Sequence, residues 1–324
     1  MTAANGREIS LAVVGAAGAV GLQLAELIGE RNVLGANLTL LGSPEGSVTE
    51  VDVGGESTSV APLTSVEVLK DFDFVFLALP ADAAAAIVAA NPGPTVIDLS
   101  AASRMPGAAP IVAPGLTPRE RFRELRSSKL FAPPHPAAQT IANVLHALEV
   151  RSGFVGATVI LSASASGREA VSALFEQSVE LLNARLELGD NETQKAFNVL
   201  QPEGSADLAA AIAAQSAALL APAPTLAVGI MQAAAFHGCG VSLSLPAAAT
   251  NAATWPERLR VAPGVIVSQS AEAVNFVGAA GQEAVLVKLN SGPASATLWC
   301  VFDAPRLIAL SAIWIAESIV AADT

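Results

Sequence analysis

The pattern of apolar and polar positions is clearest near the start of the chain. Residues 8–14 form an apolar run rich in β-branched side chains, which predicts a buried strand. A glycine-rich segment covers residues 15–21, and in residues 22–29 apolar side chains recur at helical spacing. The order strand, glycine turn, helix is typical of the first part of a Rossmann-type dinucleotide-binding domain.

The glycine turn has the properties that binding of a pyrophosphate requires. A turn without side chains lets the backbone approach the phosphates, and the following helix directs its first N–H groups and its positive dipole end toward them. A strand-to-helix turn that binds nothing is the alternative. We expect the cofactor contacts to come from Gly15, Ala17, Gly18, Ala19, Val20 and Gly21.

Further apolar runs predict strands at residues 38–41, 72–79 and 95–99. The loop after the first of these contains Glu45, whose carboxylate would repel a 2′-phosphate and accept a hydrogen bond from a free ribose hydroxyl. This favours NAD over NADP, although a solvated loop glutamate explains Glu45 equally well.

Arg104 follows the strand predicted at residues 95–99. Ligands of open α/β sheets bind beyond the carboxyl ends of the strands, and a guanidinium suits phosphate or carboxylate. Arg104 is therefore a candidate for binding substrate or phosphate, the alternative being an exposed loop cation.

Composition limits the remaining choices. The chain has 324 residues, enough for two domains, with 52% hydrophobic and 14% charged residues. A net charge of −12 argues against a nucleic-acid partner and fits a small-molecule ligand. Two cysteines and three histidines are too few for a disulfide framework or a metal site. We expect no membrane span and no signal peptide, hence a cytoplasmic protein.

Four segments together resemble the aspartate-β-semialdehyde dehydrogenase family. They are VVGAAGAVG at 13–21, VIDLSAASR at 96–104, SASGREA at 164–170 and KAFNV at 195–199. The resemblance extends from about residue 8 to the end, and the chain looks closest to the divergent Usg branch of the family. The family match implies an oxidoreductase ancestry, with NAD or NADP as cofactor and cofactor contacts also from Ser166 and Gly167.

The resemblance also shows what this chain lacks. In the family a cysteine thiolate attacks the aldehyde, hydride passes to NADP, and phosphate releases the acyl group. A helix N-terminus lowers the pKa of such a thiol. The family's cysteine position falls on Ala138, its substrate glutamine on Ala163 and its substrate arginine on Ile230. The acidic residue of the carboxylate-binding helix has no counterpart in residues 208–219, and the C-terminal signature is altered at residues 303–309.

The family's acid/base histidine falls on His237. If its segment is a strand, Cys239 shares a face with His237 and is a substitute nucleophile, although a small buried thiol is the simpler interpretation. Cys300 is expected in the core, and His135 and His146 at the surface or at helix caps. Ser162, Ser164 and Ser166 alternate, which predicts one face of a strand.

The predicted fold class is α/β, a Rossmann-type nucleotide-binding domain plus an α+β dimerisation domain. The resemblance implies that residues 1–132 and 305–324 form the first domain and residues 133–304 the substrate and dimerisation domain. The last helix, at about 305–321, also has an apolar face and a proline at its start. In the family the second sheet forms a homodimer, and the apolar run 285–289 is a candidate interface strand.

Three functions remain open at this point. The first is a homologue that has lost the dehydrogenase reaction and still binds a nucleotide. The second is an NAD(P)-dependent oxidoreductase that acts on a different aldehyde or oxo substrate, with His237 as acid or base. The third is a partner subunit that modulates an active dehydrogenase.

Overall fold

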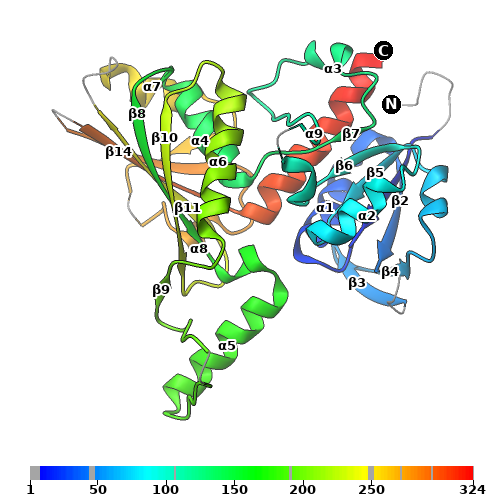
Figure 1. Cartoon of the computed structure of the whole chain (residues 1–324), viewed down its shortest axis with the longest axis horizontal. Helices are drawn as coiled ribbons and strands as arrows, with labels where there is room; N and C mark the ends of the chain where they lie inside the picture. The colour runs from blue at the N-terminus through cyan, green and yellow to red at the C-terminus, as the bar shows by residue number, and fades with distance from the viewer. Residues whose placement is uncertain are drawn as a thin grey trace. The chain divides into compact units, whose positions relative to one another are not determined.

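The computed structural model describes residues 8–43, 48–105, 107–189, 192–246, 252–270, 272–292 and 295–323. Glu45 lies outside these ranges. The chain divides into two compact units, one of Met1–His135 with Pro305–Thr324 and one of Pro136–Ala304 (Figure 1). Both are built from helices and a sheet, so the predicted α/β class is confirmed.

The first unit contains a seven-stranded sheet in the order β3-β4-β2-β1-β5-β6-β7. All neighbouring strands are parallel except β3 and β4. The order reverses between β1 and β5, the kind of switch point at which open α/β sheets bind ligands. The strands are β1 (Ser10–Val14), β2 (Asn37–Gly42), β3 (Thr49–Val53), β4 (Glu56–Pro62), β5 (Phe74–Leu77), β6 (Thr95–Asp98) and β7 (Leu130–Phe131).

Helices cover both faces of this sheet because successive strand residues point to opposite sides. One core joins alternate residues of β1, such as Leu11 and Val13, to α1 and α9. The other joins Ala12 and Val14 to α2 and to the 3-10 turn η2. The helical elements are α1 (Ala19–Arg31), α2 (Ala81–Ala89), α3 (Arg121–Glu124), α9 (Ala304–Asp323), η1 (Val33–Gly35), η2 (Val66–Asp71) and η3 (Ala102–Arg104).

Helix α9 returns from the end of the chain to the first sheet, drawn in red in Figure 1. Residues 304–322 are long and apolar enough in composition to cross a membrane, but half of that stretch is buried in the protein, as in a core helix. Arg306, in its first turn, reaches α1: Nη1 donates to Gln23 Oε1 at 3.3 Å, and Nη2 lies 3.8 Å from Glu30 Oε2.

The second unit has a mixed seven-stranded sheet in the order β12-β13-β14-β11-β8-β10-β9. Pairs β8–β10 and β12–β13 are parallel and the other neighbours are antiparallel. The strands are β8 (Phe154–Leu161), β9 (Val199–Leu200), β10 (Thr225–Ala233), β11 (Cys239–Pro246), β12 (Val265–Val267), β13 (Val285–Ser291) and β14 (Ser295–Phe302).

Helices α4, α6 and α7 pack on one face of this sheet, while α5 extends away from it beside β9 (Figure 1). Alanine-rich α6 lies close against α4 and β10, because small side chains allow short helix–strand distances. The helical elements are α4 (Pro136–Ala147), α5 (Arg168–Leu182), α6 (Ser205–Leu220), α7 (Trp255–Val261), α8 (Phe276–Ala279), η4 (Ala163–Ser166) and η6 (Ala252–Thr254).

The run 285–289, expected at a dimer interface, packs inside its own unit instead. Val285 and Val287 are buried, and Leu286 packs in a small core with Phe276 and Trp299. The more open part of the sheet lies across β8 and β10, where alternate side chains such as Phe154 and Met231 are exposed.

Candidate functional site

The glycine turn joins β1 to α1 at the switch point of the first sheet. Backbone N–H groups of Gly15 and Ala16 donate to Leu41 O at 2.8 and 3.1 Å, and Gly18 N donates to Gly15 O at 3.0 Å. These bonds fix the turn against β2. Helix α1 then begins at Ala19, so the N–H groups of its first turn have no carbonyl of the same helix four residues earlier to bind.

The three glycines of the turn do different work. A Cβ at Gly15 would lie 2.3 Å from Ala78 O, and φ there is +86°; a Cβ at Gly21 would lie 2.2 Å from Gly15 O. Both positions are therefore closed by the protein's own backbone. At Gly18 the atoms nearest to a Cβ are Gly15 O at 3.3 Å and Ala78 O at 4.0 Å, so this position is tight but less closed than Gly15 and Gly21. This cradle of backbone fits a pyrophosphate group.

A buried carboxylate organises the loop after β6. Asp98 is fully buried and accepts hydrogen bonds from Ser100 N at 2.8 Å, Ser100 Oγ at 3.0 Å and Ser103 Oγ at 2.5 Å. These bonds compensate the cost of burying the charge. They also fix the path of the loop that leads to Arg104.

The Arg104 side chain binds two segments of the first unit, one just after β6 and one after β7, through their backbone carbonyls. Its Nε donates to Pro133 O at 3.2 Å, and its Nη2 donates to Leu99 O. Burial lowers the pKa of Arg104 to about 10, an effect opposed by Asp98, so the guanidinium stays charged at neutral pH. The description of Arg104 as a free loop cation is wrong, since two of its donors bind backbone carbonyls.

His135 lies close enough to Arg104 for the positive charge of the guanidinium to lower the pKa of the imidazole. This proximity has no signal in the sequence. Burial first and Arg104 second lower the pKa of His135 to about 3, which keeps the imidazole neutral. The two residues meet because β7 pairs with β6 and brings the segment before α4 beside the Arg104 loop. A position at the surface or at a helix cap was expected for both histidines; His135 directly precedes α4, and His146 is exposed and contacts Arg151.

In the second unit the predicted nucleophile position lies in the first turn of α4. Ala138 is fully buried, and its carbonyl accepts a hydrogen bond from Ser216 Oγ of α6 at 3.3 Å. Two positions matched to substrate anchors are also buried, Ala163 at 3% and Ile230 at 2% exposure. Apolar residues therefore fill all three places.

The serine-rich segment meets the loop that carries His237. Ala163 N donates to Ala235 O at 2.8 Å, and Ser164 N donates to Phe236 O at 3.0 Å. The expectation of one strand face for the serines is wrong, because β8 ends at Leu161 and residues 163–166 form the 3-10 turn η4. Gly167 has φ of +95° and caps α5, a conformation that glycine adopts without strain.

His237 and Cys239 do not share a strand face as predicted. Gly238 between them has φ of +81°, and β11 begins only at Cys239. His237 is exposed while Cys239 is 1% exposed. Burial raises the pKa of the Cys239 thiol, which disfavours the thiolate. Cys300 is buried in β14, as expected, and burial raises its pKa to about 12.

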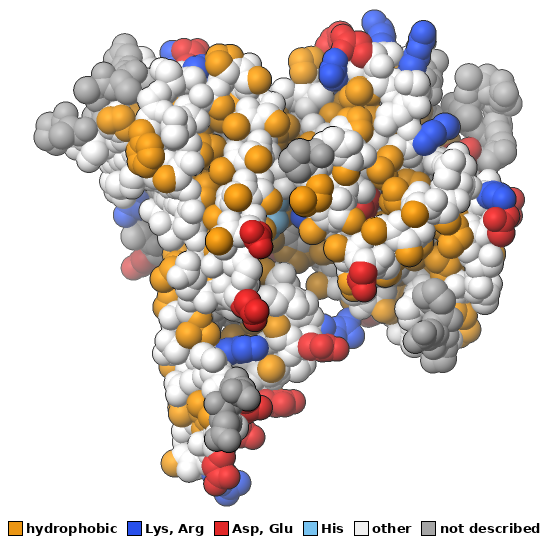
Figure 2. Space-filling view, viewed as in Figure 1, with side chains coloured by type: hydrophobic (Ala, Val, Ile, Leu, Met, Phe, Trp, Pro, Cys, Tyr) orange, Lys and Arg blue, Asp and Glu red, His pale blue; other side chains and the backbone are white. Residues whose placement is uncertain are grey.

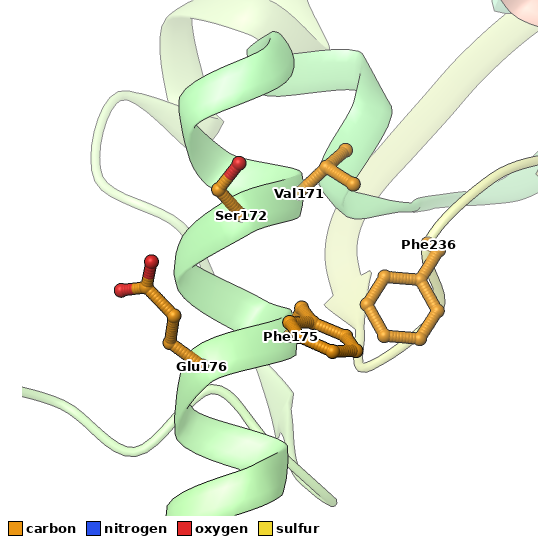
Figure 3. A pocket seen from close by; sticks show the side chains of 5 residues that line it. All are labelled: Val171, Ser172, Phe175, Glu176 and Phe236. Atoms are coloured by element: carbon orange, nitrogen blue, oxygen red, sulfur yellow. The ribbon is translucent and has the colours of Figure 1, made fainter.

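A pocket of about 360 Å³ opens between α5 and the His237 loop. Its lining residues are Val171, Ser172, Phe175, Glu176 and Phe236. Figure 3 shows the rings of Phe175 and Phe236 beside each other, with Ser172 and Glu176 farther round the helix. The sequence gave no signal for this pocket, because α5 and residue 236 meet only through the pairing of η4 with the loop. No group of three or more potential metal ligands occurs among the residues that the structure describes.

Comparison with known proteins agrees with this geometry. Residues 10–124 match the family described as "Semialdehyde dehydrogenase, NAD binding domain". These residues include the glycine turn and the Asp98–Arg104 loop. The fold and the site thus define a protein of the semialdehyde dehydrogenase class, with an NAD-binding Rossmann domain.

Relatives over the whole length narrow the assignment. The USG-1 protein homolog of Pseudomonas aeruginosa is 32% identical, covering 96% of this chain and 98% of the relative. The solved structure of a probable aspartate-semialdehyde dehydrogenase from the same organism is 30% identical, with a TM-score of 0.84 and coverage of 97% of this chain and 99% of that one. The Bacillus subtilis aspartate-semialdehyde dehydrogenase is 31% identical over 55% of this chain and 51% of its own. The chain belongs to the aspartate-semialdehyde dehydrogenase family, in the group of the USG-1 protein homologues.

Proposed function

We propose that this chain is a nucleotide-binding homologue of aspartate-semialdehyde dehydrogenase that does not catalyse the phosphorylating dehydrogenase reaction. The observation that carries the proposal is Ala138 at the place matched to the family's cysteine. A methyl group forms no thiohemiacetal, so no acyl group is held for transfer to phosphate.

Neither cysteine of the chain replaces the missing thiol. Cys239 and Cys300 are buried, and burial raises the pKa of each thiol. A nucleophilic cysteine needs the opposite setting, partly exposed and with a lowered pKa.

Loss of the substrate anchors points the same way. Ala163 and Ile230 stand where the resemblance places a glutamine and an arginine that hold the substrate, and both are buried apolar residues. An apolar pair cannot compensate the charge of a carboxylate removed from water. Restoring the thiol alone would therefore leave the amino acid moiety without a partner.

The nucleotide site is the part that remains suited to its task. The turn at Gly18, the least closed of its three glycines, and the N-terminus of α1 would hold the pyrophosphate of NAD or NADP. A bound nicotinamide would supply a hydride acceptor. NAD is the favoured form, on the ground of the carboxylate of Glu45, which follows β2 in the sequence.

The proposal includes a homodimer formed through the second sheet. Exposed Phe154 and Met231 share the face that α4 and α6 leave uncovered, together with small residues such as Thr158 and Gly229. A flat face of this kind suits packing of one sheet on another. Sedimentation or light scattering of the purified chain at about 50 μM should give twice the monomer mass, because dimers with a micromolar dissociation constant are formed at that concentration. A monomer mass under these conditions would count against the homodimer.

The decisive assay follows absorbance of the reduced nicotinamide with aspartate semialdehyde, phosphate and NAD or NADP. The Bacillus subtilis relative serves as positive control. We expect no turnover from the wild type or from Ala138→Cys, since that variant regains a thiol and no anchor. Wild-type turnover comparable to that of the control would end the proposal.

One observation favours a second function, an oxidoreductase with a different substrate. The apolar pocket at Phe175 and Phe236 adjoins the loop of exposed His237. An aldehyde or ketone with an apolar side chain would suit it, with His237 as acid or base. If neither NAD nor NADP at millimolar concentration raises the melting temperature, this function loses its cofactor.

A further inference from the structure

A second, smaller cavity lies in the first unit at the C-terminal end of α9. It has a volume of about 220 Å³ and is lined by Arg119, Glu120, Arg123, Ser318, Ala321 and Ala322. None of these residues belongs to the glycine turn or to the Asp98–Arg104 loop. The cavity is thus separate from the features that the proposed function uses.

Positive charge is concentrated at this cavity although the chain as a whole is acidic. Residues 119–129 contain five of the 17 Lys and Arg residues and only two carboxylates, a local net charge of +3 in a chain of −12. Figure 2 shows Lys and Arg side chains gathered over the region of α3. Arg121 forms an ion pair with Glu124, while no ion pair of Arg119 or Arg123 occurs within the described part of the chain.

Ser318 contributes a polar group that the protein itself does not satisfy. The residue is 1% exposed, and its Oγ has no hydrogen-bond partner among the described residues. A buried hydroxyl without a partner is destabilising. The C-terminal end of a helix attracts cations, which would explain the arginines but not a lone hydroxyl donor beneath them.

We propose that this cavity binds a small dianion, inorganic phosphate or a short dicarboxylate. The guanidinium groups of Arg119 and Arg123 supply charge-assisted hydrogen bonds, and the Ser318 hydroxyl donates a third. Glu120 also lines the cavity, and its carboxylate opposes the binding of any anion, so the two guanidinium charges leave a net charge of +1 on the lining side chains. The volume accommodates one such ion and is below that of typical pockets for larger ligands.

The test is calorimetric titration of the full chain with sodium phosphate and, separately, with malonate, at constant ionic strength set by sodium chloride. We expect saturable one-to-one binding of at least one of the two, and the comparison identifies which dianion the cavity prefers. Arg123→Gln should raise the dissociation constant about tenfold or more. Arg126→Gln removes the same charge from an exposed position that does not line the cavity, and it should change binding less than twofold.

Ser318→Ala provides an independent measurement. Removing an unsatisfied buried hydroxyl should raise the melting temperature without anion and reduce the further rise that the anion causes. Equal binding by wild type and Arg123→Gln, or an equal thermal effect of chloride and both dianions, would overturn the proposal. Nucleotide binding should be the same in all three variants, so failure here is distinguishable from failure of the proposed function.

Discussion

Substitution of Gly21 by alanine tests whether close backbone packing defines the glycine turn. An added Cβ would lie 2.2 Å from Gly15 O, 2.7 Å from Ala16 Cα and 2.9 Å from Gly15 C. All three atoms are backbone, so no flexible side chain can move away. The helix must shift from the turn that feeds it.

The expected magnitude follows from two opposed effects. Overpacking of this kind costs about 1–3 kcal/mol and more where the surroundings are rigid. Alanine regains about 1 kcal/mol over glycine within a helix. Because the obstructing atoms are backbone, we expect a net loss of about 2 kcal/mol, which lowers the melting temperature by about 4–8 °C for a unit of this size.

The measurement is scanning calorimetry of wild type, Gly21→Ala and a control on the same helix, Gly29→Ala. Gly29 is exposed, and a Cβ there meets no atom within 4 Å. The control should therefore gain up to about 1 kcal/mol. The two units can unfold in separate transitions. Urea unfolding of each variant therefore accompanies the calorimetry, and its m-value, which scales with the surface exposed, is used to assign the shifted transition to the first unit.

The reasoning about the turn is refuted by either of two results. One is a Gly21→Ala variant that melts within about 1 °C of wild type, which corresponds to a change of only about 0.3 kcal/mol in the free energy of unfolding. The other is a loss in Gly29→Ala as large as that in Gly21→Ala, which would show that helix α1 tolerates no alanine for reasons unrelated to the turn.

Three other predictions concern the first unit. Gly18→Ala should weaken NAD binding at least tenfold by titration calorimetry, since its Cβ would project from the turn that is proposed to hold the pyrophosphate, and it should lower the melting temperature less than Gly21→Ala, because the nearest backbone oxygen lies at 3.3 Å rather than 2.2 Å; unchanged affinity would place the nucleotide elsewhere. The pKa of His135 is lowered to about 3 in the folded protein, so between that pH and about 6.5 the unfolded chain binds one more proton at this histidine than the folded chain does. The free energy of unfolding should therefore be unaffected by His135 above about pH 6.5 and should fall by about 1 kcal/mol per pH unit below about pH 6. His135→Asn should flatten that slope in urea unfolding between pH 6.5 and 4.5, and an unaltered slope would contradict the assignment. Arg306→Met should lose about 1 kcal/mol through its contacts with α1, less at high salt, and a salt-independent loss would indicate packing alone.

The first unit was the part most open to prediction. The apolar run in residues 8–14 and the helical period after the glycines predicted a buried strand and a helix, and the structure has β1 and α1 there. The final helix was predicted over about 305–321 and extends over Ala304–Asp323. Such elements can be predicted from local patterns because the spacing of apolar residues within one segment is enough to indicate its type.

The site was less accessible to prediction, for reasons that particular residues make clear. The proximity of His135 to Arg104 depends on β7 pairing with β6, a long-range contact without a local signal. The alternation of serines imitated a strand, although the 3-10 turn η4 stands there. At Gly238 a single positive φ turned Cys239 inward and left His237 outside.

The return of α9 to the first sheet has a consequence for synthesis on the ribosome. The chain must extend through Pro136–Ala304, 169 residues, before the helix that completes the first unit is made. At about 5–20 residues per second this takes roughly 10–30 s, during which the apolar surface that α9 later covers is exposed to water and to chaperones. The amino-terminal unit is therefore begun first and finished last, after its neighbour has had time to fold.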